Sequence, residues 1–489
     1  MRNFIFLIFE FSIITLSFQQ KVATVRVDNC ELFIRQGAEK KMVSAPDKNY
    51  FYNYIMEVER LMSEIYYAAL RAVDPYESTR CHMDKIQAVY QSGNFNRIFV
   101  AGFGKASCPM AKAVEELFCE IIGVGIIITK YHHCLLRPQK MHIVEAGHPL
   151  PDENGLIATK EMVNILKGAD EKTLIVCLIS GGGSSLLVAP CEGLSLDEKQ
   201  KITALLLNAG ANIHELNTVR KHLSQVKGGR LAEIAHPAPV ISIILSDVIG
   251  DRLDVIASGP TAPDSKTYED ALRVLAKYNL LKVVPENVLD ILDRGAQGMI
   301  PETPKENNVI FEKVQNIIVG NNKRALEAAR EKALELGLHA EIISSEVTGE
   351  ARDAGRWLAK VALEAHSVFD KDRATKMCLI SGGETTVTVT GRGTGGRNME
   401  FALSFAMEIE SIDGITLLSA GTDGTDGPTD AAGAIVNGNT IAKAIAMGVD
   451  PGEYLRDNDS YAFFKKIDEL FVTGPTGTNV MDIQIVIIE

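Results

Sequence analysis

The sequence predicts an α/β protein of two domains, each with a largely parallel or mixed sheet flanked by helices. Short apolar runs rich in branched residues alternate with segments of helical periodicity along most of the chain. The chain has 489 residues, more than one ordinary core accommodates. Because strands that alternate with helices are joined by right-handed crossovers, the pattern favours parallel strands with helices on both faces.

The predicted strands read as segments buried on both faces. They span 97–101, 124–128, 174–179, 240–245, 316–319, 377–380 and 415–419. Helical spacing is predicted over 50–73, 106–119, 156–166, 322–336 and 350–366. A polar stretch rich in Pro and Gly, 295–308, marks a boundary. We therefore expect an N-terminal domain over 50–300 and a C-terminal domain over 309–489.

Residues 1–49 are expected to form an extension that is signal-like or disordered. Arg2 precedes the apolar run 4–18, which resembles the core of a signal peptide, but Glu10 interrupts it. The run is too short and too broken for a membrane span. We expect a cytoplasmic location without firm membrane association, with mitochondrial or secretory locations as the alternatives.

Composition limits the partners. The formal net charge is −13, which argues against nucleic acid, because binding to a phosphate backbone needs clustered Lys and Arg. A small anion bound by local cations is still compatible with this charge. A homo-oligomer is possible. The eight cysteines include no C-x-x-C pair, so neither a zinc site nor a disulfide scaffold is expected. Cys177 and Cys378 read as small buried hydrophobes.

A hexapeptide, C-L-I-S-G-G, occurs twice, at 177–182 and at 378–383. After the first copy, successive amides and hydroxyls could face phosphate oxygens, and a flexible turn is the alternative. The residues predicted to do so are Gly181, Gly182, Gly183, Ser184 and Ser185. The second copy contributes Gly382 and Gly383 and is expected to run on as a strand through V-T-V-T.

Cationic side chains follow glycines at two places. Lys105 lies in G-F-G-K-A-S, between a predicted strand and a helix, where it could bind an anion or form a solvated turn. Arg397 lies in G-R-G-T-G-G-R, which opens a helix, and Arg suits bidentate contact with phosphate or carboxylate. A mobile hairpin is the alternative for this second loop.

Carboxylates follow two other predicted strands. Asp247 and Asp251 could hold Mg²⁺ or a substrate hydroxyl, or serve as a helix cap and a turn residue. The segment G-T-D-G-T-D-G-P-T-D lacks the glutamate of a calcium loop, and its parallel-strand context favours phosphoryl transfer over a structural turn. Its predicted nucleotide contacts are Thr422, Asp423 and Gly424. Its predicted metal ligands are Asp423, Asp426 and Asp430.

Other polar groups carry less information. A lone histidine, His148, could touch a ligand but is more often structural. The basic segment 217–230 contains Arg220, Lys221, Lys227 and Arg230. We expect these four to form a solvated helix face rather than a binding site.

Taken in order, these motifs resemble the class II glycerate kinases, also called the MOFRL family, over about 50–489. The resemblance implies ATP- and Mg²⁺-dependent phosphorylation of D-glycerate to 2-phosphoglycerate. It also implies a Rossmann-like N-terminal domain and an active site in the cleft between the domains. Lys105 and Arg397 match positions regarded as critical in the family, and both could neutralise charge on a transferring phosphoryl group.

Within that framework, we expect the first glycine turn and the 423–430 loop to cradle nucleotide and metal, and Asp247 or Asp251 to orient the glycerate hydroxyl. The two C-L-I-S-G-G turns would face each other across the cleft. One alternative is an NAD(P)-dependent hydroxypyruvate reductase, although no full dinucleotide fingerprint is present. The other is a non-catalytic sugar-acid binding protein.

Overall fold

A computed structural model of the protein describes residues 13–18, 21–28, 31–36, 39–43, 48–134, 136–369 and 375–489, with side chains from Glu57 onward. The extension predicted over 1–49 to be signal-like or disordered lies partly outside this range, at 1–12, 19–20, 29–30, 37–38 and 44–47. An antiparallel sheet precedes the α/β domains. Its strands are β1 (Ile13–Phe18), β2 (Lys21–Asp28), β3 (Glu31–Gln36) and β4 (Glu39–Val43). Within the described residues, no helix is both long enough and apolar enough to cross a membrane.

The first α/β sheet has six parallel strands in the order β10-β9-β8-β5-β6-β7. They are β5 (Arg97–Phe103), β6 (Ile122–Lys130), β7 (His142–Ala146), β8 (Thr173–Ile179), β9 (Val240–Leu245) and β10 (Val314–Gly320). Numbered along the chain, this is the 3-2-1-4-5-6 order of a Rossmann fold. The prediction of a Rossmann-like N-terminal domain is therefore confirmed. The strand order reverses between β5 and β8.

Helices cover both faces of this sheet, which explains why its central strands are continuous apolar runs. Every residue of β8 is buried. Leu174, Val176 and Leu178 face a core shared with α4, whereas Ile175 and Cys177 face a core shared with α5. Alternate side chains of a strand point to opposite faces, so both sets must be apolar.

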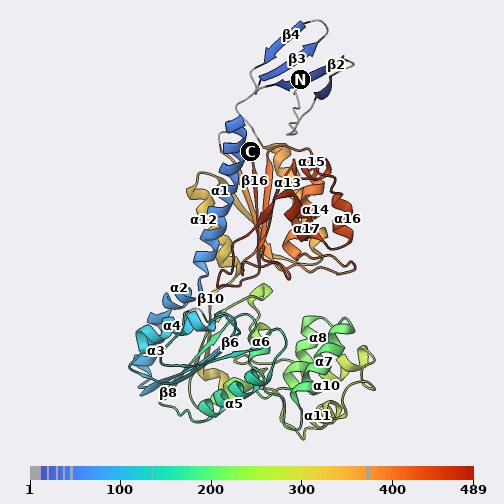
Figure 1. Ribbon diagram of the computed structural model, residues 1–489. Helices are drawn as coiled ribbons and strands as arrows, with labels where there is room; N and C mark the ends of the chain where they lie inside the picture. Colours follow the sequence, from blue (N-terminus) through green and yellow to red (C-terminus); the bar gives the residue numbers. More distant parts are fainter. Residues whose placement is uncertain are drawn as a thin grey trace.

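The remaining helices of this half form two groups. Beside the sheet lie α2 (Pro75–Arg80), α3 (Met83–Ser92), α4 (Ser107–Phe118), α5 (Glu153–Lys167), α6 (Gly183–Leu186) and α9 (Arg230–Ala235). A lobe with its own apolar core consists of α7 (Leu196–Asn208), α8 (Ile213–His222), α10 (Tyr268–Lys277) and α11 (Glu286–Ala296). Figure 1 shows this lobe beside the first sheet. Short 3₁₀ turns are η1 (Ile249–Asp251), η2 (Ile256–Ser258) and η3 (Val309–Lys313).

The second sheet is mixed, in the order β11-β12-β16-β13-β14-β15. Its strands are β11 (His339–Val347), β12 (Met377–Gly383), β13 (Ile415–Gly421), β14 (Gly433–Asn437), β15 (Leu470–Phe471) and β16 (Asp482–Ile488). Only the pair β11 and β12 is parallel. The helices are α1 (Lys48–Ala72), α12 (Asn322–Glu335), α13 (Ala351–Val368), α14 (Arg397–Glu408), α15 (Thr440–Ala446), α16 (Pro451–Arg456) and α17 (Ser460–Ile467).

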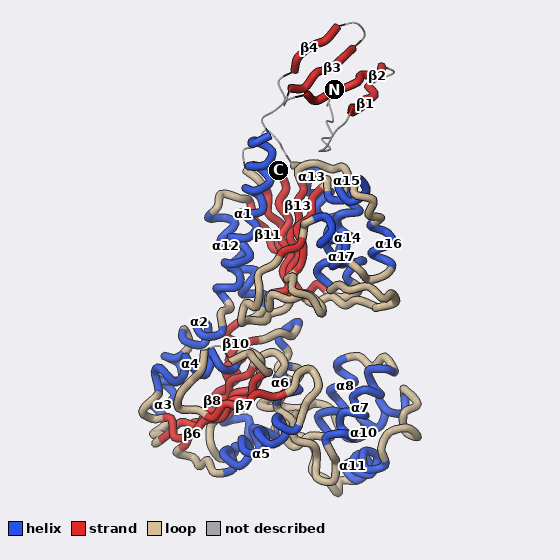
Figure 2. The backbone as a smooth tube through the Cα atoms, in the orientation of Figure 1, coloured by secondary structure: helices blue, strands red, loops and turns tan. Residues whose placement is uncertain are grey.

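Figure 2 shows α1 and α12 on one side of this sheet and α13, α14 and α17 on the other. The helix that opens the α/β part of the chain thus packs on the second sheet, where the Tyr66 hydroxyl donates to the Gly421 carbonyl at 2.7 Å. Conversely, the strand predicted at 316–319 completes the first sheet as β10. The division between the two sheets therefore does not coincide with the polar stretch 295–308.

All seven predicted strands occur, with ends within a few residues of the expected ones. The sequence reading did not identify the four strands β1 to β4 of the extension, nor β7, β11, β14, β15 or β16. One extension was wrong: after β12 the segment V-T-V-T does not continue as a strand. Instead, this segment is held by side chains, since Thr388 N and Thr388 Oγ1 both donate to the Glu350 carboxylate, at 2.8 and 3.0 Å.

Candidate active site

Two glycine turns meet where the strand order of the first sheet reverses. Lys105 N, just beyond β5, donates to Gly181 O at 2.9 Å, and Ala106 N donates to Ser180 Oγ at 3.0 Å. Ligands of open α/β sheets bind outside the carboxyl ends of the strands at such a switch point. The turn that carries Lys105 and the first C-L-I-S-G-G turn therefore form one continuous edge.

The glycines of this edge allow other side chains to approach its backbone closely. A Cβ on Gly181 would lie 2.3 Å from Asp247 Oδ2, and one on Gly182 would lie 2.8 Å from His148 Cδ2. Gly182 also has a φ of +80°, which favours glycine. Asp247 and His148 thus sit against the same turn. Burial, followed by Lys105, Lys130 and His133, lowers the pKa of His148 to about 4, so the imidazole is neutral at pH 7.

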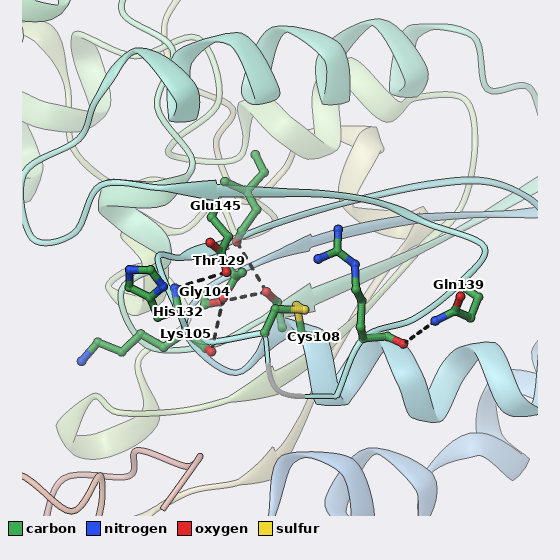
Figure 3. The surroundings of a disulfide bond; sticks show 11 residues. Gly104, Lys105, Cys108, Thr129, His132, Gln139 and Glu145 are labelled. Carbon is green, nitrogen blue, oxygen red and sulfur yellow. Dashed lines mark hydrogen bonds between the residues drawn. A yellow bond between two sulfur atoms is a disulfide. The ribbon is translucent and has the colours of Figure 1, made fainter. Parts of the chain in front are cut away.

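Covalent and hydrogen bonds fix the turn that carries Lys105 (Figure 3). Thr129 Oγ1 donates to Lys105 O at 3.4 Å, and Ser107 Oγ donates to Gly104 O at 2.8 Å. In the first turn of α4, Cys108 forms a disulfide with Cys134. The spacing of the cysteines gave no indication of this bond. Cys177 and Cys378 are buried, as predicted.

The second sheet contributes Arg397 at the first position of α14. Its Nε donates to Asp482 Oδ2 at 2.6 Å, its Nη2 to Asp482 Oδ1 at 3.0 Å, and its Nη1 pairs with Glu384 at 2.8 Å. Asp426 accepts from the backbone N–H groups of Asn398 and Met399, at 3.0 and 2.8 Å. Asp426 therefore caps this helix from a distant loop and fixes the start at which Arg397 stands.

Charges from the two halves converge across a cleft of about 1340 Å³. Lys105 Nζ lies 4.0 Å from Asp423 Oδ2. Burial raises the pKa of Asp247, while Lys105 and Arg397 oppose that rise. Burial likewise raises the pKa of Glu384, and again Arg397 is the main opposing charge. Two cations and several carboxylates thus share one desolvated space, an arrangement found at catalytic centres.

The cleft contains part of the predicted site. Its lining includes Gly182, Gly183, Ser184, Asp247, Arg397, Asp423 and Asp426. The first C-L-I-S-G-G turn reaches it through Ser180 and Gly182, whereas of the second only the following residue, Glu384, lines it. The predicted facing of the two turns therefore stays a prediction.

Other predicted residues have structural partners. Asp251 accepts from Asn321 Nδ2, and Asp430 accepts from the Tyr461 hydroxyl at 2.8 Å. Thr422 is buried and donates to Met481 O at 2.6 Å. Six more lie outside the lining: Lys105, Gly181, Ser185, Gly382, Gly383 and Gly424. Lys105 nevertheless adjoins two lining residues, since its Nζ is 4.0 Å from Asp423 Oδ2 and its Cγ would lie 3.3 Å from a Cβ on Gly182. Three of these glycines are needed for close packing. A Cβ would lie 2.3 Å from Asn322 Oδ1 at Gly382, 2.2 Å from Val347 O at Gly383, and 2.0 Å from Gly474 O at Gly424.

The three aspartates of the 423–430 loop do not form a ready-made metal site. In the part of the chain that the structure describes, no three His, Cys, Asp or Glu side chains are grouped to hold a metal ion. Mg²⁺ in kinases is commonly held by one or two carboxylates together with substrate phosphates and water. Asp423, which faces Lys105 across the cleft, fits such a role better than the capping Asp426 or the distant Asp430.

Sequence reasoning missed several residues of the site. Asp482 opens β16 and is 1% exposed, yet its strand was not predicted. Asn398 Nδ2 donates to Asp482 Oδ1 at 2.9 Å and completes the network around Arg397. The loop before β16 is also close: Asn479 Nδ2 would lie 3.4 Å from a Cβ on Gly181. The motif T-G-P-T-G-T-N, which ends at Asn479, was the available signal.

The expectation of a solvated cationic face near α8 was wrong. Lys221 is 2% exposed and Lys227 is fully buried. Arg230 is half-buried and donates to Ser224 O and to the Tyr268 hydroxyl, at 2.5 and 2.9 Å. Periodicity did not reveal this because the helical lobe covers the face that would otherwise meet solvent.

A Rossmann-ordered domain and a mixed-sheet domain that enclose cationic and carboxylate groups define a two-domain α/β protein with an anion-binding cleft. Residues 61–293 match a model described as "Domain of unknown function (DUF4147)", and residues 377–482 match the MOFRL family. The D-glycerate 2-kinase of Thermotoga maritima is 46% identical over 428 residues, which are 87% of this chain and 97% of that protein. The glycerate 2-kinase of Pyrococcus horikoshii is 40% identical over 443 residues, with coverages of 88% and 98%.

The crystal structure of a glycerate kinase from Thermotoga maritima superposes with a TM-score of 0.79, and the match covers 89% of this chain and 100% of that one. At 46% identity this similarity extends beyond fold to sequence. The chain belongs to the MOFRL family of class II glycerate kinases.

Proposed function

We propose that the protein transfers the γ-phosphoryl group of ATP to D-glycerate, with Mg²⁺, giving 2-phosphoglycerate and ADP. The observation that carries this proposal is the convergence of Lys105 and Asp247 from one domain with Arg397 and Asp423 from the other. Relatives that share most of the chain bear the names D-glycerate 2-kinase and glycerate 2-kinase, which supports the reaction and its position.

The residues present fit a nucleotide and a metal. Glycine backbone at 182 and 183 lines the cleft together with Arg397, and Lys105 lies against Gly182. Mg²⁺, when bound, would supply positive charge that neutralises the nucleotide phosphates. Asp423 is the carboxylate that would hold it.

The remaining roles follow from charge and position. Lys105 and Arg397 neutralise charge on the transferring group. Asp247 accepts the proton of the glycerate 2-hydroxyl as that oxygen attacks, and a pKa raised by burial makes this carboxylate a better base near neutral pH. Closure of the domains excludes water, which limits ATP hydrolysis.

Two other functions fit less well. Some relatives carry the name putative hydroxypyruvate reductase. In G-F-G-K-A-S, however, Ser107 stands where the third glycine of a dinucleotide fingerprint would be. The Lys105 ammonium group also lies beside Asp423 at the cleft. A non-catalytic sugar-acid binding protein would not need a base beside two phosphoryl-neutralising cations.

The test is product formation by the full chain from D-glycerate, ATP and Mg²⁺, coupled to enolase in the absence of phosphoglycerate mutase. We expect the wild type to form product. In Lys105→Ala the rate should fall about 100- to 1000-fold, which is the range seen when one charge-stabilising donor is removed. ADP release without enolase signal would indicate the 3-position or hydrolysis. Oxidation of NAD(P)H by hydroxypyruvate, without kinase activity, would establish the reductase instead.

A further inference from the structure

Two buried lysines, Lys199 and Lys227, and the partly buried Arg220 lie near the Ser184 end of the first glycine turn. We call them the buried cation cluster. Lys227 Nζ donates to Ser184 O at 2.7 Å, to Ser184 Oγ at 3.2 Å and to Leu187 O at 3.3 Å. Lys199 Nζ donates to Leu223 O at 2.9 Å. All these acceptors are neutral.

The cluster has no carboxylate partner among the described residues. Its neighbour Lys221 shows the contrast, since it pairs with Asp264 at 3.2 Å and with Asp254 at 3.7 Å. Burial lowers the pKa of Lys199 to about 7 and that of Arg220 to about 10, and it lowers the pKa of Lys227 well below its ordinary value. Burial thus favours the neutral forms of the two lysines, whereas Arg220 keeps its charge at pH 7. A charge without compensation in a desolvated place is costly, so the surroundings of Arg220 indicate a missing anion.

Arg220 is the member of the cluster that borders the cleft. Its Nη2 makes one long hydrogen bond, 3.4 Å to Ser184 O, and its Nε is buried without any hydrogen-bond partner. A buried N–H group normally has a partner. The guanidinium therefore has donor capacity that the protein itself does not use, next to a space that admits a ligand.

The surroundings suit a small hydroxylated anion. Ser184 Oγ lies 2.8 Å from Ser258 Oγ, and Ser258 Oγ donates to Asn217 Oδ1 at 3.0 Å, and all three residues line the cleft beside Arg220. Arg220 and Asp247 line the same cleft as these three residues, so an acid bound by Arg220 shares one space with Asp247.

We propose that Arg220 binds the carboxylate of D-glycerate and so directs the 2-hydroxyl toward Asp247. This inference rests on the proposed function. A planar guanidinium matches a carboxylate with two parallel donors, whereas a lysine would supply a point charge only. In the proposed function, Lys105 and Arg397 would serve the nucleotide phosphates and Asp423 the metal, which leaves Arg220 for the acid. Arg220, which keeps its charge at pH 7, supplies positive charge at this end of the cleft.

The test compares D-glycerate with its neutral analogue glyceramide in wild type and Arg220→Gln. In Arg220→Gln we expect kcat/KM for D-glycerate to fall about 100-fold, as for removal of one partner of a buried charge pair. Glyceramide turnover and the KM for ATP should stay near their wild-type values, so the preference for the acid collapses. Arg273→Gln, an exposed arginine on α10 paired with Asp270, is the matched control and should keep the wild-type preference.

Binding gives a second readout, independent of turnover. Calorimetric titration of D-glycerate into the full chain without ATP should show binding to the wild type and little to Arg220→Gln. If that variant does not fold, Arg220→Lys keeps the charge but not the fork, and a reduced preference for the acid over glyceramide is expected. An unchanged preference, or a rise in the KM for ATP alone, would overturn the assignment. Failure of the proposed function is distinct, because the wild type itself would then not phosphorylate D-glycerate.

Discussion

Arg397 and Asp482 form a two-point ion pair, with Nε to Oδ2 at 2.6 Å and Nη2 to Oδ1 at 3.0 Å. Asp482 is buried at the start of β16, so the guanidinium is oriented from the rigid centre of the second sheet. Its third edge faces Glu384 and the cleft. The position of Arg397 thus depends on a residue that lies 85 positions away in the chain.

The first prediction concerns this pair. Asp482→Asn keeps the shape of the side chain but removes the charge that orients Arg397, so kcat for D-glycerate should fall by up to about 100-fold, as for a displacement of about 1 Å. The KM for D-glycerate should change little. Asp413→Asn, in an exposed loop, is the control. Equal rates in both variants would show that Asp482 does not orient Arg397.

The second prediction separates two carboxylates that the sequence could not rank. Asp247 lines the cleft between Lys105 and Arg397, whereas Asp251 is bound by Asn321. Asp247→Asn should lower kcat about 100- to 10,000-fold if this residue takes the hydroxyl proton. Asp251→Asn should retain most of the wild-type rate. Steady-state kinetics with D-glycerate decide between them, and a larger loss in Asp251→Asn would reverse the assignment.

Much of the fold could be predicted from local sequence patterns. Six of the seven predicted strands are largely buried, as their continuous apolar runs indicated, whereas the seventh, β10, is only partly buried although its run is apolar. β7 and β11 were missed because their residues are only partly buried, so the apolar signal is weak. The placement of α1 on the second sheet and of β10 in the first depends on long-range packing, which no short window of sequence records.

The site residues could be predicted where a motif follows the end of a strand, and were harder to predict elsewhere. Lys105, Asp247, Arg397 and Asp423 were identified from glycine and charge beyond strand ends. The capping role of Asp426 is a contact with a helix start 27 to 28 residues earlier in the chain, and spacing cannot show it. Arg220 was assigned to solvent because a basic helix usually faces water, and only the tertiary arrangement of the helical lobe shows otherwise.

The third prediction concerns the metal. If Asp423 holds Mg²⁺ with the nucleotide phosphates, Asp423→Asn should raise the Mg²⁺ concentration for half-maximal rate about 10- to 100-fold at saturating ATP. Asp430→Asn is the matched change in the same loop and should leave that concentration unaltered, because its partner is Tyr461. Titration of the rate with Mg²⁺ is the measurement. Equal shifts in both variants would argue against Asp423 as the ligand.

The fourth prediction concerns the disulfide. Cys108 and Cys134 close a loop with a sequence separation of 26, so Cys108→Ser should lower the stability of the first domain by about 3 kcal/mol. Urea unfolding followed by far-UV circular dichroism should show the loss. Trp357 lies in α13 on the second sheet, and its fluorescence should shift less. Cys81→Ser, a change at an exposed free cysteine, is the control, and an equal loss there would contradict the assignment.

The last prediction is a pH dependence at the glycine turn. Burial and the charges of Lys105, Lys130 and His133 lower the pKa of His148 from 6.5 to about 4. Between those values the unfolded chain binds the proton more readily than the folded one, so stability falls as pH decreases from 6.5 toward 4. His148→Gln should remove that part of the slope, whereas His214→Gln, an exposed histidine on α8, should not. The free energy of unfolding at pH 7 and pH 4.5 measures it. An unchanged slope in His148→Gln would mean that this imidazole is not held neutral against the turn, and that Lys105 is less confined than its surroundings indicate.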